Sequence, residues 1–553
     1  MSALLLALLL VPLVGAAVCG AMATREHLDR AGKLVGLGFS AVSLVLVAVV
    51  WALFRTGPGT PRFQFELAVD WIPAFGTRFA LGLDGIALTM IALLAVLVPI
   101  VLGFAWAEKL PPGRTGAGFT ALMLATQGVL VGVFAATDVF LFYVLFEAML
   151  IPMYFLIGRF GGPRRQYAAV KFFLYSFLGG LIMLASVIGL FVASESRLGQ
   201  GTFDWAALQQ MAGQLPLSTQ IPLFLGFFAA FAIKAPLVPL HTWLPDAGAE
   251  APVAGGVILV GLLDKVGVFG FLRYTLPLFP AASRELAPLV LTLAVIGVLY
   301  GALLAAAQTD MKRFVAYTSI AHFGFIALGI FAFSSQAIAG SALYMVNHGI
   351  STAMLFLAVG LLIRRGGTAS MTEYGGVARI APLLAGLFLI AGLSTLSLPG
   401  TNSFVSEFLV LIGAFPNRPV FTVIATVGII FAALYVLWVY QRVFTGPVRG
   451  AAVVGDGPGA ASAAALGGGG SGDATGDVQT ADDSAARRTT GRFGDLTRAE
   501  VAIMTPLVAL VLVLGFFPGP VLAVLEPAVS ATMSEVGVPD PVAPAAPTTG
   551  VPR

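Results

Sequence analysis

The sequence has few charged residues. Lysine, arginine, aspartate and glutamate make up 10% of its 553 residues, while 58% are hydrophobic and the mean hydropathy is +0.95. A soluble domain carries about 25% charged residues, so this composition excludes an ordinary cytosolic enzyme. It also excludes disorder over most of the chain, because apolar surface is abundant. The net charge of +3 is too small to indicate a nucleic-acid partner.

Cysteine is almost missing, since Cys19 is the only one. A single thiol cannot form an intrachain disulfide, and it cannot hold an iron–sulfur cluster or a structural zinc ion. Neither a glycine-rich dinucleotide fingerprint nor a P-loop follows any strand-like segment. We therefore expect this chain to bind no redox cofactor, nucleotide or metal of its own.

Long apolar runs dominate the chain instead. A transmembrane helix needs about 20 apolar residues, so we expect an all-α integral membrane protein with about fourteen spans. The first run follows no basic residues, and Val18 is bulky where a signal cleavage site needs a small residue, which favours a span over a secretory signal. The runs lie at residues 2–18, 33–54, 84–106, 117–136, 138–158, 167–194, 221–240, 251–274, 286–307, 311–333, 336–363, 380–413, 419–441 and 500–527.

Segments between the runs predict the remaining organisation. Two extended stretches within 57–83, at 63–67 and 78–81, predict an extramembrane hairpin. Residues 203–208 predict a surface helix with Trp205 at the membrane interface.

Two segments are too poor in apolar residues to order themselves. We expect a disordered loop rich in glycine, alanine and serine at 446–498, and a disordered proline-rich tail at 536–553. The expected domains are helices 1–3 with the hairpin (1–116), a first repeat of helices 4–8 (117–274), a second repeat of helices 9–13 (286–445), the loop (446–498), the last transmembrane helix (499–535) and the tail (536–553).

The distribution of basic residues predicts the topology. Of the 30 lysines and arginines, 19 fall in odd-numbered loops and 8 in even-numbered loops or the C-terminal tail. Cytoplasmic loops carry the excess of basic residues. We therefore expect a multi-pass protein of the bacterial inner (plasma) membrane, with both termini outside and the loop 446–498 in the cytoplasm.

Several titratable residues lie inside the apolar runs. A charge at a helix centre costs about 2.5–3.5 kcal/mol on insertion scales, so it is rare and usually functional. The residues concerned are Glu147, Lys171, Lys234, Lys265, His322, His348 and Glu407.

Several of these residues also have a structural interpretation. Lys171 lies near a helix end and can extend to the lipid headgroups, while Glu147 and Lys234 can form a structural ion pair. Lone histidines on apolar faces are usually hydrogen-bonded core residues. Because Asp264 directly precedes Lys265, the two side chains are expected on different helix faces. Asp84 and Asp138 each open a helix, which is typical of capping residues.

Two of the runs are interrupted near a buried charge. Lys234 lies two residues before Pro236, and the long twelfth run contains Pro399 and Gly400 before Glu407. Proline removes a backbone donor and breaks a helix. The two broken helices are five spans apart, hence of opposite orientation, which predicts two inverted five-helix repeats with an ion path near the midplane.

A line of glutamates, lysines and histidines is suited to carrying protons. A carboxylate that moves toward or away from a buried lysine changes how firmly the lysine holds its proton, and histidine can connect such groups. No cluster of carboxylates indicates a calcium site, and no carbonyl-rich filter indicates a potassium site. Protons are therefore the favoured ion, with sodium second.

The sequences around these residues resemble a known family over roughly 80–445. The similar segments are Phe146-Glu147, 234–247 (KAPLVPLHTWLPDA), 250–255 (EAPVAG) and 316–324 (AYTSIAHFG). They resemble the antiporter-like membrane subunits of respiratory complex I. Complex I has three such subunits. Two of them usually carry lysine on the broken twelfth helix, and the third, chain M, carries glutamate there. This chain has Glu407 at that position.

The resemblance implies roles for the residues. Glu147 would pair with Lys234, Lys265 would be the central relay, and Glu407 would lead toward the outer face, with quinone reduction elsewhere driving the cycle. The family often has a second histidine where this chain has Gly248, so a relay role at that position is in doubt. His322 and His348 would continue the hydrated axis, and the supporting positions are Lys171, Pro236, His241, Asp246 and Pro399.

The resemblance also implies partners and cofactors. The partners would be other membrane subunits of complex I, including two more antiporter-like subunits and the lateral helix of chain L, within the lipid bilayer. NADH, FMN, iron–sulfur clusters and quinone would be used in other subunits. A subunit of a multi-subunit sodium/proton antiporter, and a passive scaffold whose buried charges only hold helices together, are the alternatives.

Overall fold

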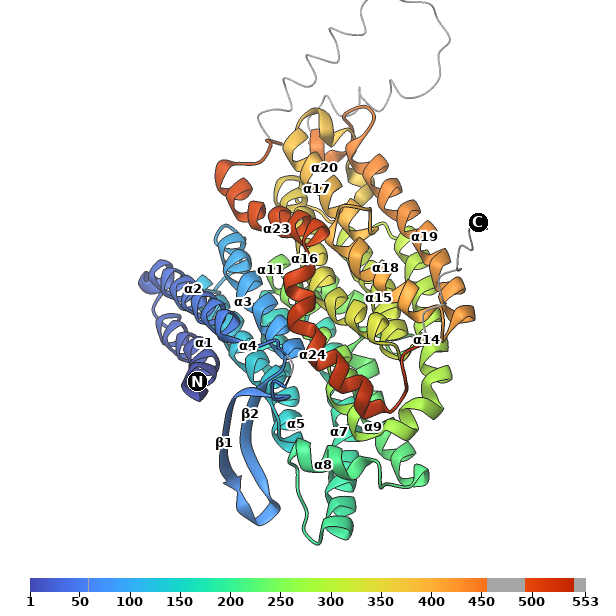
Figure 1. Cartoon of the computed structure of the whole chain (residues 1–553). Helices are drawn as coiled ribbons and strands as arrows, with labels where there is room; N and C mark the ends of the chain where they lie inside the picture. The colour runs from blue at the N-terminus through green and yellow to red at the C-terminus, as the bar shows by residue number, and fades with distance from the viewer. Residues whose placement is uncertain (58, 455–492, 542–553) are drawn as a thin grey trace, which may run out of the picture.

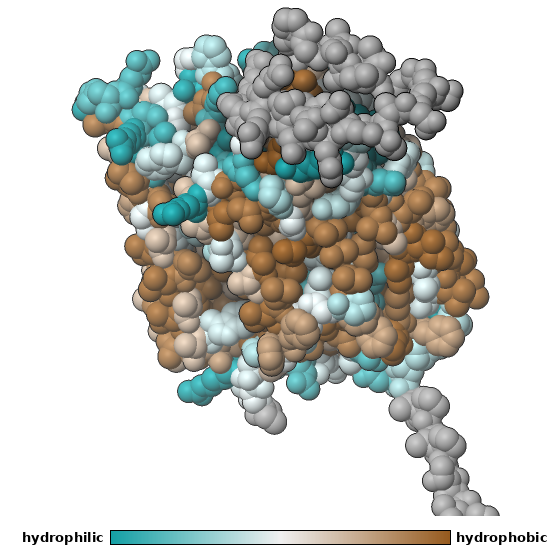
Figure 2. Space-filling model, turned by 90° about the horizontal axis from the view of Figure 1, so that it is seen from above, coloured by the Kyte–Doolittle hydropathy of each residue, from teal (hydrophilic) through white to brown (hydrophobic). Residues whose placement is uncertain are grey.

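The computed structural model describes residues 1–57, 59–454 and 493–541, and helices make up most of it (Figure 1). Thirteen of the described helices are long and apolar enough to cross a membrane, by length and composition. The shorter apolar helices α17 and α18 would together supply a fourteenth span. In Figure 2 a broad hydrophobic belt separates two edges on which hydrophilic residues gather. The expectation of an all-α membrane protein is confirmed.

The N-terminal part combines three long helices with a two-stranded sheet. The antiparallel strands form the expected hairpin, which projects from the helical body in Figure 1. The elements are α1 (Ser2–Met22), η1 (Glu26–Leu28), α2 (Asp29–Leu53), β1 (Gln64–Ile72), η2 (Pro73–Phe75), β2 (Thr77–Leu83) and α3 (Gly85–Ala105).

The next part contains the first interrupted helix. Its elements are α4 (Gly116–Ala135), α5 (Val139–Ala148), α6 (Leu150–Phe160), α7 (Arg165–Leu198), α8 (Trp205–Ala212), α9 (Leu217–Lys234), α10 (Trp243–Glu250), α11 (Val253–Ile258), the π-helical turn η3 (Leu259–Leu263), α12 (Lys265–Gly270), the π-helical turn η4 (Phe271–Thr275) and α13 (Leu276–Leu278).

The remaining part contains the second interrupted helix. Its elements are α14 (Pro280–Ala306), α15 (Met311–Ile330), α16 (Ser335–Gly366), η5 (Met371–Glu373), η6 (Val377–Arg379), α17 (Pro382–Thr395), α18 (Asn402–Ala414), α19 (Pro419–Phe444), α20 (Ala451–Val454), α23 (Arg498–Phe516) and α24 (Gly519–Val536).

Polar side chains fix where several of these helices begin. Asp84 accepts a hydrogen bond from the Ala87 N–H at 2.8 Å, and Asp138 accepts one from the Leu141 N–H at 2.8 Å. Both are the capping residues expected from the sequence, because they satisfy donors that have no partner within the helix. Thr497 and Glu500 form a capping box at the start of α23.

Contacts between helix ends define two opposite faces of the bundle. At the first, which we call the arginine face, the N–H of Arg164, in the loop before α7, donates to the Glu250 carboxylate at the end of α10. Lys312 of α15 donates to the Ala251 carbonyl on the same face. At the second, which we call the hairpin face, the start of α5 bonds to the hairpin and to the segment before α8. The interrupted helix α9–α10 runs toward the arginine face. The other, α17–α18, runs toward the hairpin face, where α18 ends beside Ser334.

Two expectations differ from the structure. Trp205 is buried rather than interfacial, and its indole N–H donates to the Arg273 carbonyl at 2.7 Å. The segment 499–535 forms two helices rather than one, because Pro518 interrupts the hydrogen-bond ladder after Phe517. Figure 1 shows α24 crossing the front of the molecule.

The expectations for the loop and the tail fall partly outside the described residues. Residues 455–492 of the loop and 542–553 of the tail are not described. The ends that are described are ordered: Arg365 donates to the Gly494 and Asp495 carbonyls, and Asp540 accepts hydrogen bonds from Ser335. For these ends, the expectation of disorder was wrong, because backbone and side-chain bonds hold them to the bundle.

Candidate functional site

Titratable side chains lie deep inside the helical bundle, as the sequence predicted. Lys234, Lys265 and Asp264 are fully buried, and His322, His348 and Glu407 are at most 5% exposed. Glu147 is partly buried. Since a buried polar group needs a hydrogen-bonding partner, the contacts of each group show which residues act together.

Lys234 ends α9 where the first interrupted helix breaks. Its ammonium nitrogen lies 4.9 Å from the centre of the Phe172 ring and 6.0 Å from that of Trp243. The Trp243 indole N–H donates to the Ile233 carbonyl at 2.8 Å and so fastens α10 to the end of α9. A helix C-terminus and aromatic faces both favour a cation.

Glu147 lies on α5 against the neighbouring helix α7. A Cβ at Gly180 would collide with the Glu147 carboxylate, so this glycine leaves room for the acid. Among the described residues, neither carboxylate oxygen of Glu147 nor the Lys234 nitrogen has a hydrogen-bonding partner, and no ion pair joins the two. The structure thus brings them into one region without direct contact.

Lys265 is the most highly connected residue of the site. Its ammonium nitrogen donates to the Val260 carbonyl at 2.6 Å and to Asp264 Oδ1 at 3.2 Å. It also lies 2.7 Å from His348 Nδ1. These contacts join α12 to α16 at the centre of the bundle.

The expected separation of Asp264 and Lys265 onto different helix faces was wrong. The two side chains form a buried ion pair. The π-helical turn Leu259–Leu263 comes immediately before them, and its wider turn changes the directions that side chains take. π-Helical turns inside α-helices are frequent at functional sites.

A second series of contacts leads from the histidines to Glu407. The rings of His348 and His322 have centroids 5.4 Å apart. His322 Nδ1 lies 2.7 Å from the Tyr344 hydroxyl oxygen, and that hydroxyl donates to Glu407 Oε2 at 2.6 Å. Ser397 donates to the same carboxylate oxygen at 2.6 Å. The groups from Asp264 to Glu407 therefore form a continuous series broken only by the step between the two imidazole rings.

The sequence did not predict three residues as parts of this site: Asp264, Tyr344 and Ser397. A sequence pattern for one of them exists, because Tyr344, His348 and Ser351 recur at the spacing of one helix face. Ser397 lies in the second break with a backbone φ of +60°, a conformation that residues other than glycine rarely adopt. Such strained positions cluster at functional sites.

A buried polar cluster fixes the second break against α16. The Asn347 side chain donates to the Asn402 carbonyl at 2.8 Å, and the Asn402 side chain donates to the Asn347 carbonyl at 3.0 Å. Ser351 lies 2.6 Å from Ser394 across the same contact. These bonds set the position of α18, and hence of Glu407, relative to Tyr344.

The supporting positions expected from the sequence divide into two groups. Pro236 and Pro399 lie in the two breaks. Lys171 does not extend freely to solvent: its nitrogen lies 2.7 Å from Asp246 Oδ2, while Arg313 pairs with Asp246 Oδ1. His241 is buried in the first break, and its Nδ1 has no hydrogen-bonding partner among the described residues.

The two breaks carry the same backbone hydrogen bonds. In the first, the N–H groups of Ala235, Leu237 and Leu240 donate to the carbonyls of Phe231, Ala232 and Leu237. In the second, the N–H groups of Leu396, Leu398 and Thr401 donate to the carbonyls of Gly392, Leu393 and Leu398, each 161 residues later.

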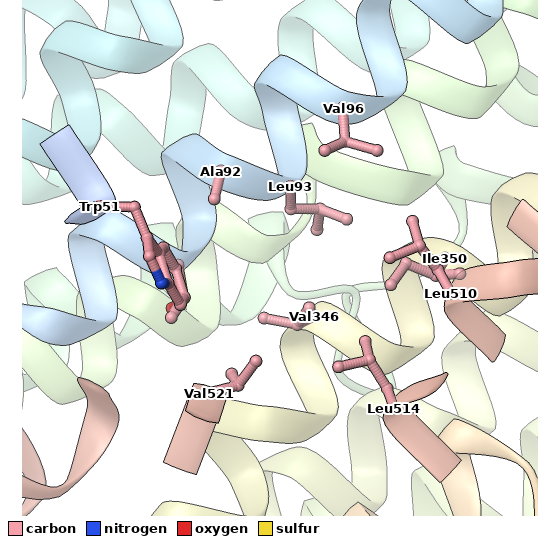
Figure 3. Close-up of a pocket in the computed structure, with 10 residues that line it drawn as sticks. Trp51, Ala92, Leu93, Val96, Val346, Ile350, Leu510, Leu514 and Val521 are labelled. Carbon is pink, nitrogen blue, oxygen red and sulfur yellow. The ribbon is translucent and has the colours of Figure 1, made fainter. Parts of the chain in front are cut away.

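The site does not coincide with an apolar cavity elsewhere in the bundle. Figure 3 shows Trp51, Leu93, Val346 and Leu514, from four different helices, around a space of about 130 Å³. Thr89 is the one polar residue in its lining. Val346 lies two residues from His348 on α16, so the cavity flanks the opposite side of that helix. Within the described residues, no group of three or more histidine, cysteine, aspartate or glutamate side chains could hold a metal ion.

Comparison with known proteins gives consistent relatives. A family model described as NADH:quinone oxidoreductase/Mrp antiporter, TM, matches residues 136–432. NADH-quinone oxidoreductase subunit M of Mycobacterium tuberculosis is 43% identical over 563 residues, covering 96% of this chain and 94% of that protein. The subunit of the same name from Pseudomonas aeruginosa is 41% identical, covering 80% of this chain and 87% of that protein.

Solved structures show the same likeness. A chain of respiratory complex I from Thermus thermophilus matches with a TM-score of 0.79 and 31% identity, covering 97% of this chain and 100% of that chain. A chain of the Mrp complex from Dietzia sp. matches with a TM-score of 0.78 and 23% identity, covering 97% of this chain and 99% of that chain. At the latter identity the likeness shows a shared fold only.

Proposed function

The chain belongs to the family of NADH-quinone oxidoreductase M subunits, and on that premise we propose that it translocates protons through the buried series from Glu147 to Glu407. The observation that carries the proposal is the buried series from Asp264 through Lys265, His348, His322 and Tyr344 to Glu407, in which only the step between the two imidazole rings is not a hydrogen bond. Every group in it can hold or pass a proton. A scaffold needs paired charges, but it does not need them aligned in this way.

The two lysines occupy different environments, which suits a cycle of loading and release. Lys265 is held by Asp264 and His348, while Lys234 has aromatic rings around it and no hydrogen-bonding partner among the described residues. Movement of Glu147 toward Lys234 would stabilise a proton there, and withdrawal would release it toward Lys265. Water molecules would complete the steps that side chains leave open.

The path has a direction if the basic loops are cytoplasmic. Protons would enter at the arginine face, pass Lys234 and Lys265, and leave beyond Glu407 at the hairpin face. The termini would then lie outside and the loop 446–498 inside. Quinone reduction in other subunits, which hold FMN and the iron–sulfur clusters and use NADH, would drive the cycle, and this chain would bind no cofactor.

We propose the other membrane subunits of complex I as partners. They include two further antiporter-like subunits and the lateral helix of chain L. Exposed apolar side chains along α7 and α19, such as Leu178 and Ile430, would contact these subunits or the bilayer. The curated relatives compared above are all M subunits of the quinone reductase, which does not favour the sodium/proton antiporter alternative.

Substitution of the first pair tests the proposal. In the purified complex reconstituted in vesicles, Lys234→Ala and Glu147→Ala should abolish coupled proton translocation while the complex still assembles. An assembled variant that pumps normally would refute the relay. Loss of assembly in both variants would support a scaffold, and sodium-dependent transport by the parent would support the antiporter alternative.

A further inference from the structure

The acid at the second break has an equivalent at the first. The backbone hydrogen bonds of the two breaks repeat with a spacing of 161 residues. By that spacing Glu407 corresponds to Asp246, whereas Lys234 corresponds to Thr395. Asp246 lies on α10 and Glu407 on α18, each in the half-helix that follows its break.

The two acids also have similar surroundings. Glu407 is bound by Tyr344, on the long helix α16 that precedes its interrupted helix. Asp246 is bound by Lys171, on the long helix α7 that precedes its own. Because the interrupted helices run in opposite directions, Glu407 lies toward the hairpin face and Asp246 toward the arginine face.

We infer that Asp246, held by Lys171 and Arg313, is the proton-accepting group at the mouth of the first half of the path, as Glu407 is at the mouth of the second. The inference rests on the proposed function, which it deepens by naming an inlet. The Asp246 side chain is 17% exposed and that of Lys171 is 20% exposed, so water reaches both. Lys234, by contrast, is fully buried.

The contacts suggest how the inlet opens and closes. Lys171 binds one carboxylate oxygen and Arg313 binds the other, so the acid is held ionised while both cations are in place. When Lys171 withdraws, one oxygen becomes free to take a proton from hydronium at the arginine face, which leaves a neutral water molecule behind. The proton then passes inward, where His241 Nδ1 and Lys234 are polar atoms without a hydrogen-bonding partner among the described residues.

A second contact between the same helices keeps them in register. Thr242, which directly precedes α10, donates to the Tyr175 hydroxyl at 2.9 Å. Tyr175 lies one turn after Lys171 on α7, and Thr242 lies one turn before Asp246. Phe172 packs against Trp243 with ring centroids 5.3 Å apart, and both rings surround Lys234. A movement of Lys171 on α7 is therefore mechanically linked to the rings that contact Lys234.

The test compares Asp246→Asn with Glu250→Gln in the intact complex in vesicles. Glu250 lies on the same half-helix and pairs with Arg164 at 3.4 Å. At the spacing of 161 residues it corresponds to Leu411, which cannot carry a proton. General acid–base groups contribute about 10²–10⁴-fold, so we expect Asp246→Asn to slow proton translocation at least about tenfold and Glu250→Gln to leave it within about twofold.

The chemical readout is rescue by a small weak acid. Acetate or azide delivers protons to a site that has lost its own acid, so it should restore translocation in Asp246→Asn, and Asp246→Glu should retain it. A slow Asp246→Asn variant that neither weak acid restores would show a structural role and overturn the inference. Normal pumping by Asp246→Asn, while Lys234→Ala is inactive, would overturn the inference alone. Normal pumping by Lys234→Ala would overturn the proposed function itself.

Discussion

Replacement of Tyr344 by phenylalanine removes the one hydroxyl that connects His322 to Glu407. The hydroxyl oxygen lies 2.7 Å from His322 Nδ1 and 2.6 Å from Glu407 Oε2. A hydrogen bond between neutral groups contributes about 1 kcal/mol and one to a charged group about 1.5–3 kcal/mol. Loss of both hydrogen bonds therefore destabilises the hydrogen-bonded arrangement of His322 and Glu407 by about 2–4 kcal/mol, which corresponds to a factor of about 30–1,000 in its equilibrium constant.

We expect Tyr344→Phe to lower NADH-driven proton translocation through this chain at least about 30-fold, because the ring still fills its place but cannot pass a proton. The assay follows the pH change inside vesicles that contain the purified complex, after NADH is added. Thermal unfolding of the same preparation measures the structural cost separately.

The matched control is Tyr274→Phe. Tyr274 is also fully buried, and its hydroxyl donates to the Ala136 carbonyl at 3.0 Å, away from the relay. The control should lose a similar amount of stability, about 1 kcal/mol, and keep its pumping. Equal pumping by Tyr344→Phe and Tyr274→Phe would refute the reasoning, since the bridging hydroxyl would then have no role in transfer.

Three further substitutions test individual contacts. Gly180→Ala should displace the Glu147 carboxylate and reduce coupled activity. Gly38→Ala, whose added Cβ meets no atom of the described residues within 4 Å, should leave activity unchanged. Equal activity of the two variants would contradict the assigned position of Glu147. Asp264→Asn should lower the free energy of unfolding by about 3–5 kcal/mol, because it leaves the buried Lys265 charge without its ion-pair partner. Asp29→Asn, which breaks a partly exposed pair with Lys33, should cost less than about 1 kcal/mol. Similar melting temperatures of the two variants would contradict the buried pair. Burial raises the pKa of Glu108 above its usual 4.5, despite a hydrogen bond from the Val253 N–H and the charges of Lys312 and Arg364. The folded state therefore binds the proton more tightly than the unfolded state, and the free energy of unfolding should fall as pH rises from about 4.5 through the raised pKa. Glu108→Gln should remove that fall in melting scans from pH 4 to 8, and an unchanged pH dependence would contradict the raised pKa.

The sequence was enough to predict the spans, the breaks and most of the buried titratable residues. Apolar runs of the length of a bilayer leave few alternatives for the backbone, and proline beside Lys234 and within the twelfth run marked both interruptions. Charges in apolar runs are conspicuous because they are costly. Lys265, His348 and Glu407 were therefore recognisable without coordinates.

The connections between those residues were harder to predict. Tyr344 was counted with the apolar residues of its run, although it shares a helix face with His348. The Asp264–Lys265 pair was missed because the expectation assumed a regular α-helix, and the π-helical turn before them changes which side chains meet. The separation of Glu147 from Lys234 depends on side-chain conformations that spacing along the chain does not determine.

The C-terminal region shows a different limit. The apolar run 500–527 reads as one span, and Pro518 falls within it. The structure turns the chain there, and α24 packs against the body, with Arg62 donating to the Ala528 carbonyl at 3.0 Å. A run of apolar residues predicts burial, but it does not say whether lipid or protein provides it.

The most direct test of the relay is the number of protons translocated per NADH by Lys265→Met, measured in vesicles containing the assembled complex. Lys265 joins Asp264 to His348 at the centre of the series, and methionine keeps its length without its charge or donors. The account predicts that proton translocation through this chain is lost and that the ratio falls below that of the parent. An unchanged ratio at an unchanged rate of NADH oxidation would contradict it.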